Sequence, residues 1–432
     1  MANTQSLANR ISTSLSALTK LTEATYGPSL DLSESGALVV GEKQGSFAAQ
    51  DESLSKARND LVNTAQELLH LAQGPIDHMV SLAYGATDTA NLAMVVQFGI
   101  PQKVPFHMSI SLSDLAIATS LPEDTLARTM RYAITNGVFA EPSPGRFAHT
   151  AASATLAKNK NLSDMVIFKS GFSSRVVISL ADALKAQQLN ALDAPEAAFN
   201  VSYPGYANFF EYMGKHPEAS QGYFDYLDGR SKLPLYAVEN VVGSWDWAKV
   251  GSGLIVDVGG SSGHTSIALA RAFPSAKFLV QDINLSGLEL GREIVGKDPD
   301  LKQRVSFQEH DFFKPQLVEA DVYFFRNILH DWPDEKFIEI IQALVPALKS
   351  GSRILLSEGV MPEPPAARSA LLEDKQVRME DLAMVASHNS RERSVDQYTS
   401  LFKAVDGRFS LVGVTGKRPG VHHSLIEYTF AN

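Results

Sequence analysis

The chain has 432 residues, enough for about two to three domains. Hydrophobic residues make up 44% of it and charged residues 20%, a composition that excludes a mainly disordered or fibrous protein. Its net charge of −10 disfavours attraction to nucleic acid or to an anionic membrane. Because cysteine is absent, disulfides, thiolate metal ligands and a cysteine nucleophile are excluded.

The first residues lack a basic segment followed by an apolar core, so we expect no secretory signal. No window reaches about 18 consecutive apolar residues, so we expect no membrane span. Together these features predict a cytoplasmic protein.

Two amphipathic helices are predicted near the amino terminus, separated by a loop over residues 27–50 that is rich in Gly, Ser and Pro. Apolar residues recur at helical spacing in both, at Leu7, Ile11, Leu15, Leu18 and Leu21 in the first and at Leu54, Leu61 and Leu68 in the second. Their apolar faces could pack within their own domain or form a dimer interface. The peripheral position of the two helices favours the dimer.

Residues 110–150 have the pattern of a winged helix, in which Ser120 and Glu123 form a capping box at the start of the second helix. The predicted elements are a helix over 113–120, a helix bearing Leu126, Met130 and Ile134, and strands over 138–141 and 146–149. A winged helix often binds DNA, but the second helix and its end hold more acids than bases. We therefore expect no nucleic acid partner.

Aromatic side chains are concentrated in one stretch of the next region. They are Tyr203, Tyr206, Phe209, Phe210, Tyr212, Tyr223, Phe224 and Tyr226. Such a group can form part of a hydrophobic core, or it can line a pocket for a flat or aromatic substrate. Both interpretations remain open from the sequence.

Strand and helix patterns alternate from about residue 250 to the end of the chain. The predicted strands are 254–258, 277–281, 305–308, 321–325, 353–357, 409–413 and 424–428, and the predicted helices are 265–273, 285–295 and 335–348. This alternation predicts an α/β fold with a doubly wound, mostly parallel sheet. We therefore divide the chain into an all-α and winged-helix region (1–160), a helical and substrate-pocket region (161–250) and an α/β domain (251–432).

A glycine-rich turn, Asp257-Val-Gly-Gly-Ser-Ser-Gly263, joins the first of these strands to its helix. Gly259, Gly260 and Gly263 would let the backbone approach a ligand closely, at the edge where such sheets bind ligands. The spacing departs from the dinucleotide-binding pattern, and the preceding Asp257 suits a cationic ligand better than a pyrophosphate. A tight structural turn is the alternative.

Acidic residues follow the next two strands. Asp282 ends the second strand, where a carboxylate suits a ribose diol, although a helix N-cap would explain it too. Asp311 and Phe312 follow the third strand, in position to hydrogen-bond and stack an adenine. Without other support, that pair would be a loop carboxylate and a core aromatic.

The strongest local signal is the segment from Arg326 to Glu335, which follows the fourth strand. A helix start explains its acids and its proline, but it does not explain His330, which would lie at the ligand edge of the sheet. Histidine titrates near neutral pH and can act as a general base. Glu358, at the end of the fifth strand, and Glu392 could orient this histidine.

Several motifs together resemble the plant- and fungal-type S-adenosylmethionine-dependent O-methyltransferases. They are Asp257-Val-Gly-Gly260, Val280-Gln-Asp282, His310-Asp311-Phe312, Ile328-Leu-His-Asp-Trp332 and Arg391-Glu-Arg-Ser394. The resemblance extends over nearly the whole chain, and fungal members share the Arg326-x-x-x-His330 and Phe147-x-His149-Thr150 patterns. The chain departs from the family at Ser261, where many members have glycine, and at Tyr226-Leu227, where Ala-Met is common.

The resemblance implies a Rossmann-like catalytic domain that binds S-adenosyl-L-methionine, preceded by a dimerisation domain. The cofactor would be held by Asp257, Gly259, Gly260, Gly263, Asp282, Asp311, Phe312 and Arg326. His330 would be the base, with Glu358 and Glu392 beside it. Candidate substrate contacts are His149, Phe209, Tyr212 and Asp331, and no metal is expected.

Two functions follow from this resemblance. The first is O-methyl transfer to a hydroxyl of a small aromatic or enolic secondary metabolite, by a homodimer with no nucleic acid or membrane partner. The alternative is a pericyclase or dehydratase of fungal pyridone alkaloid pathways, which binds S-adenosylmethionine as a fixed positive charge without transferring methyl. In that case His330, Arg326 and His149 would donate hydrogen bonds to a carbonyl.

Overall fold

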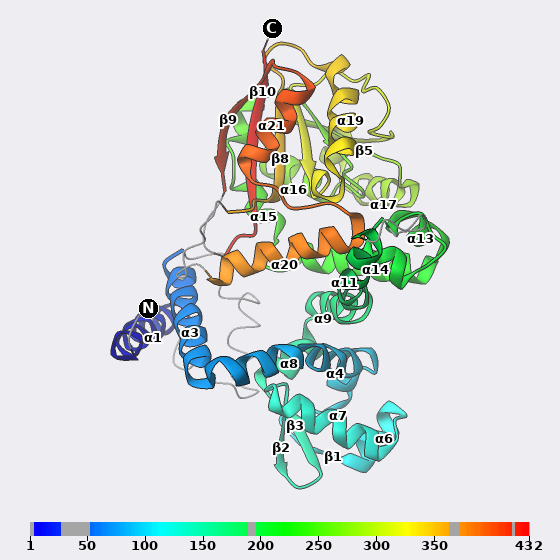
Figure 1. Cartoon of the computed structure of the whole chain (residues 1–432). Coiled ribbons are helices and arrows are strands. Elements are labelled where there is room, and N and C mark those ends of the chain that lie inside the picture. The colour runs from blue at the N-terminus through cyan, green and yellow to red at the C-terminus, as the bar shows by residue number, and fades with distance from the viewer. Residues whose placement is uncertain (1–3, 27–51, 189–195, 363–370, 417–419, 432) are drawn as a thin grey trace. The chain divides into compact units, whose positions relative to one another are not determined.

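The computed structural model describes residues 4–26, 52–188, 196–362, 371–416 and 420–431 (Figure 1). The chain forms two compact units. The N-terminal unit comprises 1–179, 210–235 and 367–372, and the sheet unit comprises 180–209, 236–366 and 373–432. Residues 161–250, predicted as one region, are thus divided between the two units, and the loop predicted over 27–50 lies outside the described residues.

The sheet unit is built on a seven-stranded sheet with the order β6-β5-β4-β7-β8-β10-β9. The strands are β4 (Leu254–Val258), β5 (Lys277–Asp282), β6 (Val305–Glu309), β7 (Val322–Arg326), β8 (Arg353–Gly359), β9 (Phe409–Thr415) and β10 (His423–Phe430). The first five are parallel, and β10 is antiparallel to both of its neighbours. The predicted doubly wound sheet is therefore confirmed, and its order reverses between β4 and β7, where such sheets bind ligands.

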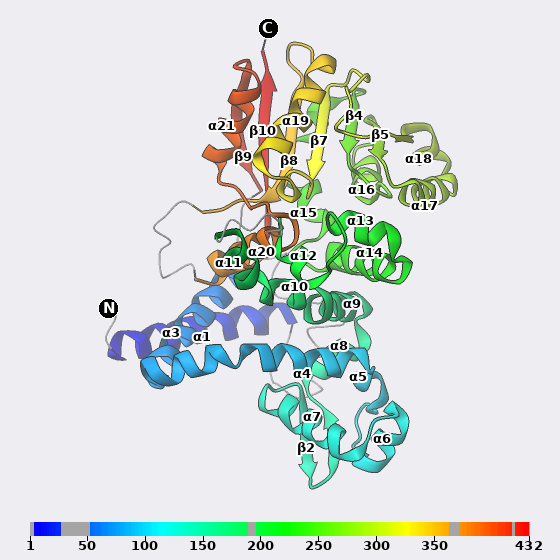
Figure 2. The same ribbon diagram turned by 45° about the vertical axis from the view of Figure 1, so that its right-hand side comes forward.

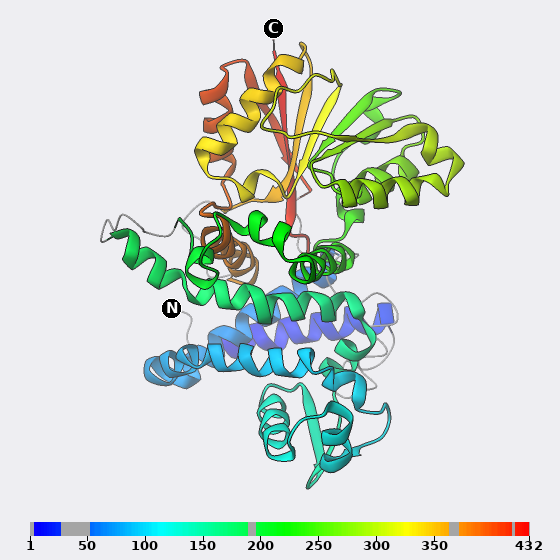
Figure 3. The same cartoon turned by 90° about the vertical axis from the view of Figure 1, so that its right-hand side faces the viewer.

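Helices cover both faces of this sheet, which explains why its strands are nearly continuous apolar runs. On one face, α19 (Asp334–Leu344) and α21 (Val395–Val405) bury Phe337, Ile340, Tyr398 and Phe402. On the other face, α16 (His264–Ala272), α17 (Leu285–Gly296) and α18 (Pro299–Arg304) bury Ile267, Leu269, Leu288, Val295 and Leu301. Figures 2 and 3 show these two layers on opposite sides of the strands.

The remaining elements of the sheet unit are one helix of 18 residues and several shorter helices and turns. They are α11 (Leu180–Gln188), α12 (Ala198–Ser202), α15 (Val238–Val242), α20 (Leu371–His388) and the 3-10 turns η2 (Trp247–Val250), η3 (Leu329–Asp331) and η4 (Val345–Ala347). The helix predicted over 335–348 ends earlier, at Leu344, and continues as η4. Pro346 lacks the N–H that a longer α-helix would need at this point.

The N-terminal unit is mainly helical. Its elements are α1 (Thr4–Tyr26), α3 (Glu52–Ala83), α4 (Gly85–Gln97), α5 (Ile100–Lys103), α6 (Leu112–Thr119), α7 (Glu123–Thr135), α8 (Ala151–Lys158), α9 (Lys160–Phe168), the π-helical turn η1 (Lys169–Ser173), α10 (Ser174–Ile178), α13 (Phe209–Lys215), α14 (Pro217–Lys232) and strands β1 (Ile110–Ser111), β2 (Phe139–Ser143) and β3 (Arg146–His149). The predicted helices α1 and α3 lie side by side, and α3 is kinked at Gly74, where φ is 68°. Among the described helices, none is long and apolar enough to cross a membrane.

The predicted capping box at Ser120 is wrong. Ser120 ends α6 in a left-handed conformation with φ of 56°, and Pro122 directly precedes α7 without a side-chain cap. The serine that does cap a helix in this segment is Ser111, whose hydroxyl accepts a hydrogen bond from the N–H of Asp114 at 3.1 Å. A serine in a turn can serve the end of one helix as easily as the start of the next, and spacing alone does not distinguish the two.

The aromatic stretch at 203–226 is divided between the two units. In the sheet unit, Tyr203 stacks on Phe199 with ring centroids 5.3 Å apart. In the N-terminal unit, Tyr226 of α14 stacks on Phe168 of α9 at 4.6 Å. At least part of this group is therefore internal packing, and the pocket-wall interpretation stays a prediction.

Candidate active site

His330 lies in the turn that follows β7, at the carboxyl edge of the sheet. β7 ends at Arg326, and Asn327 adopts a left-handed φ of 53°, which turns the chain sharply out of the strand. Asparagine tolerates this conformation better than most residues. The turn continues into η3, where His330 is buried.

Glu358 holds the backbone of this turn. It is at the carboxyl end of β8, which pairs with β7, and its Oε1 accepts hydrogen bonds from the N–H groups of Ile328 and Leu329, both at 3.1 Å. Its Oε2 is 3.8 Å from Nδ1 of His330. Burial raises the pKa of Glu358 to about 7, against the opposing effect of His330 and the two amides.

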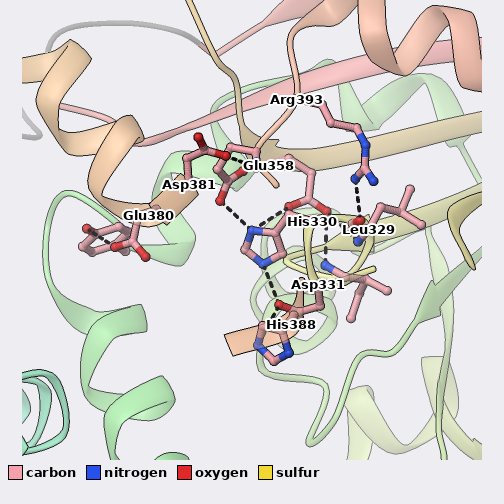
Figure 4. A network of polar contacts seen from close by, with 11 residues as sticks. Leu329, His330, Asp331, Glu358, Glu380, Asp381, His388 and Arg393 are labelled. Carbon is pink, nitrogen blue, oxygen red and sulfur yellow. Dashed lines mark hydrogen bonds and ion pairs between the residues drawn. The ribbon is translucent and has the colours of Figure 1, made fainter. Parts of the chain in front are cut away.

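Glu392 holds the side chain of His330. Its Oε1 is 2.7 Å from Nδ1 of His330, and neither side chain is more than 6% exposed (Figure 4). Because an ionised carboxylate only accepts hydrogen bonds, Nδ1 carries the proton and Nε2 is left for another partner. Burial would lower the pKa of His330, but Glu392, Glu358 and Asp331 outweigh it and raise this pKa to about 10.

Arg393 completes the support of the turn, and sequence reasoning assigned it no role. Its guanidinium is fully buried and donates to the carbonyl oxygens of Leu329 and Trp332 at 2.9 and 2.7 Å, and to Asp334 at 2.7 Å. Two consecutive residues thus hold the side chain and the backbone of the same turn. A basic residue directly after Glu392, within the Arg391-Glu-Arg-Ser394 motif, was the available signal.

The glycine-rich turn after β4 approaches the His330 turn closely. Gly259 has φ of 74°, and a Cβ at this position would lie 2.5 Å from Cδ1 of Ile328. A Cβ on Gly260 would lie 2.7 Å from Cγ of Asp257. Ser261 adopts φ of 51°, so the turn keeps a left-handed conformation where many members of the resembled family have glycine. Only glycine fits at these two positions, because neighbouring side chains occupy the place of a Cβ; this glycine turn, which we call the cradle, lies at the predicted ligand edge.

Asp257 and Arg326 lie around this cradle and have partners within the protein. Asp257 is 3% exposed, accepts a hydrogen bond from the Ser266 hydroxyl at 2.6 Å, and burial raises its pKa to about 6. Arg326 donates to Nε2 of His264 and to the carbonyl oxygen of Tyr236, both at 2.9 Å. Asp257 is thus buried against the turn. His264, which sequence reasoning missed, contacts Arg326 and fixes its orientation.

The predicted nucleoside-binding residues lie along the same edge. Asp282, at the end of β5, accepts hydrogen bonds from the N–H groups of Ser261 and Asn284, both at 2.8 Å. The chain after β6 is tied to β5, because the N–H of His310 donates to the carbonyl oxygen of Asp282 at 3.1 Å. Phe312 then packs edge-on against Trp332 at 5.9 Å. The carboxylate of Asp282 and the ring of Phe312 therefore lie at the same edge of the sheet as the glycine cradle.

Two of the four candidate substrate residues belong to the N-terminal unit. His149 belongs to the N-terminal unit, where its ring nitrogens are 2.9 Å from the Ser153 hydroxyl and 3.0 Å from the carbonyl oxygen of Val104. Tyr212 is in the same unit and stacks on His216 at 4.2 Å. These contacts account for the positions of both side chains, and their substrate roles stay predictions.

The other two candidates are close to His330 in the sheet unit. Asp331 has Oδ1 at 3.5 Å from Nε2 of His330. Phe209 is buried and packs edge-on against His388 at 5.1 Å. Within the described residues, no group of three or more His, Asp or Glu side chains could hold a metal ion.

Comparisons with known proteins identify the family and the fold. The O-methyltransferase domain family matches residues 162–407. O-methyltransferase aoiF of Aspergillus oryzae is 32% identical over 386 residues, which cover 87% of this chain and 88% of the relative. OxaC, solved with sinefungin and meleagrin, has a TM-score of 0.76 at 22% identity, over 99% of this chain and 100% of its own. LepI in complex with SAM has a TM-score of 0.72 at 20% identity, over 98% and 99% of the two chains. At these identities the two solved structures show a shared fold.

The support that Arg393 gives to the turn predicts a large effect on stability. We expect Arg393→Met to lower the free energy of unfolding by about 3 kcal/mol, because the carbonyl oxygens of Leu329 and Trp332 lose this donor and Asp334 keeps only its longer contact with Arg391. Urea denaturation followed by fluorescence measures this. Arg378→Met, which removes an exposed ion pair with Asp374, is the control and should change stability much less. Equal effects of the two substitutions would contradict the assigned role.

Proposed function

The chain belongs to the O-methyltransferase family, and we propose that it transfers the methyl group of S-adenosylmethionine to a hydroxyl of a small aromatic or enolic metabolite, with His330 as the base. The observation that carries this proposal is the buried His330–Glu392 pair beside the glycine cradle. When bound, S-adenosylmethionine supplies a methyl group activated by the positive sulfonium.

The edge of the sheet has the residues that such a cofactor needs. Asp282 is partly exposed at the end of β5, where its carboxylate would hold the ribose hydroxyls. Asp311 and Phe312 would hold the adenine. Asp257, Gly263 and Arg326 would fix the shape of the cradle. A side chain on either cradle glycine would collide with Ile328, Asp257 or Val280, so a substitution there would displace the turn.

The electrostatics of His330 suit the removal of a phenolic proton. An ordinary phenol has a pKa of about 10, so a strong base makes this transfer favourable. The carboxylates around His330 raise its pKa to about 10 and thereby match it to the phenol. Glu392 holds Nδ1, so Nε2 is the nitrogen that would accept the proton while the oxygen attacks the methyl group, in those molecules whose Nε2 has already lost its own proton to solvent. Much of the remaining rate increase would come from fixed orientation of the reacting groups.

The same raised pKa supports a second function. An imidazolium at His330 donates a hydrogen bond, as a pericyclase or dehydratase would need in order to polarise a carbonyl. This alternative requires S-adenosylmethionine to remain intact, whereas methyl transfer consumes it.

Substitution of His330 tests the proposed base. We expect His330→Ala to keep its affinity for S-adenosylhomocysteine, measured by calorimetry, and to lose about 10²- to 10⁴-fold in turnover. Turnover is measured with methyl-labelled S-adenosylmethionine and a panel of hydroxyaromatic and pyridone substrates. His107→Asn, an exposed position with φ of 61° that asparagine tolerates, is the control and should keep full activity.

The labelled assay also separates the two functions. A product that gains the labelled methyl group, with the cofactor consumed, supports the proposal. An isomerised or dehydrated product with the cofactor unconsumed would replace methyl transfer by the alternative. Full activity of His330→Ala would remove His330 as the base.

We also propose that the protein is a homodimer through the second half of α3. This segment and the residue that follows it expose many apolar side chains, namely Leu68, Leu69, Leu71, Ile76, Met79, Val80, Leu82 and Tyr84. Large exposed apolar surfaces often mark protein–protein interfaces. The resemblance of this region to a dimerisation domain favours a second copy of the chain as the partner.

Charge placed on this surface should separate the subunits. We expect the wild-type protein to sediment as a dimer. We expect the double variant Ile76→Glu, Met79→Glu to sediment as a folded monomer, because a dimer would bury the two added carboxylates without a cation to pair with them. Leu317→Glu, at an isolated position of the sheet unit that is 85% exposed, should leave the dimer intact. A stable wild-type monomer would remove this proposal.

A further inference from the structure

A second histidine lies beside the proposed base. His388 is the last residue of α20, and its side chain is only 8% exposed. Phe209 packs edge-on against its ring at 5.1 Å and so limits its orientation. The proposed mechanism does not use this histidine, although it belongs to the same unit and the same polar network as His330 (Figure 4).

The two histidines share one oxygen atom. Oδ1 of Asp331 is 3.5 Å from Nε2 of His330 and 3.7 Å from Nε2 of His388. Both distances are longer than that of a good hydrogen bond, so the Asp331 carboxylate lies between the two histidines without a close hydrogen bond to either. A small rotation of the Asp331 side chain would bring it within bonding distance of one histidine and away from the other.

Asp331 is also the least restrained carboxylate around His330. Glu392 is fixed by its 2.7 Å contact with Nδ1, and Glu358 by the two amides of the turn. Within the described residues, the contacts of the Asp331 carboxylate are the two longer ion-pair distances to His330 and His388. Its side chain is 15% exposed, compared with 1% for Glu392 and 0% for Glu358.

The two rings differ in charge. Glu392, Glu358 and Asp331 face His330 and raise its pKa to about 10, despite burial. Burial lowers the pKa of His388, where Asp331 raises it and the neighbouring His330 lowers it. Near neutral pH, His330 is therefore the cation that attracts Asp331, while His388 is neutral and can offer an N–H.

We propose that Asp331 is a movable carboxylate: it pairs with the protonated Nε2 of His330 in the resting protein, and it turns to His388 once that nitrogen has released its proton to solvent and accepts a hydrogen bond from a substrate hydroxyl. His388 is then a positioning residue, because it acts on the base through Asp331. The inference rests on the proposed role of His330 as the base. It predicts that His388 determines how strongly Asp331 competes with the substrate hydroxyl for Nε2 of His330.

The sharing of Asp331 can be measured on the protein alone. In full-length protein with ¹⁵N-labelled histidine, NMR titration gives the pKa values of His330 and His388, assigned through single substitutions. We expect Asp331→Asn to lower both pKa values by roughly one unit, because both rings lose the same anion. A shift of only one of the two histidines, or of neither, would overturn the proposal. Glu339→Gln, an exposed carboxylate of α19, is the control and should move neither.

Substitution of His388 tests the competition. We expect His388→Phe to raise the pKa of His330, because Asp331 then has a single partner, and His388→Gln to return it toward the wild-type value by restoring an amide donor. Equal His330 pKa values in wild type and His388→Phe would overturn the positioning role. If His388→Phe does not fold, Asp331→Asn and His388→Gln decide the question. The titration contains no cofactor or substrate, so its failure is distinct from a failure of methyl transfer in the labelled assay.

Discussion

The interaction on which this site depends is the buried hydrogen bond between Nδ1 of His330 and Glu392. Its two atoms are 2.7 Å apart, and both side chains are almost completely excluded from water. Burial of an imidazole without an anion would lower its pKa and favour the neutral ring. The carboxylate reverses this effect, fixes the tautomer and leaves Nε2 on the side of Asp331. The surrounding structure holds the geometry, since Glu358 ties the amides of the turn and Arg393 ties its carbonyls.

The turn that carries the base is also joined to the proposed cofactor cradle. Ile328 lies directly over Gly259, where even a methyl group would collide with it. Asp282 holds the N–H of Ser261 and so fixes the other side of the cradle. In the proposed site, the positions of the cofactor and of the base would therefore be set by the turns that follow neighbouring parallel strands, β4, β5 and β7. This arrangement suits a reaction in which three atoms must be aligned.

The sequence predicted those features that depend on local pattern. The strands of the α/β region match the observed ones to within a few residues, because buried parallel strands are long apolar runs with turns between them. The sequence alone could predict that His330 and Glu358 lie near each other, because both are placed at the ends of strands that share one edge of the sheet. The capping box at Ser120 failed because the same serine could serve either neighbouring helix. Arg393 and His388 were not found, because their partners are distant in sequence and only the fold brings them to the turn.

The central claim is that carboxylates hold His330 as an unusually strong base, and the pH dependence of methyl transfer tests it most directly. Since kcat/KM reports the ionisation of the free enzyme, it should rise with pH as His330 loses its proton, with an apparent pKa far above 6.5 and near the expected value of about 10. Glu392→Gln removes an anion that stabilises the imidazolium, so the apparent pKa should fall and the rise should occur at lower pH. A wild-type profile without this rise, or one that is identical in Glu392→Gln, would contradict the account.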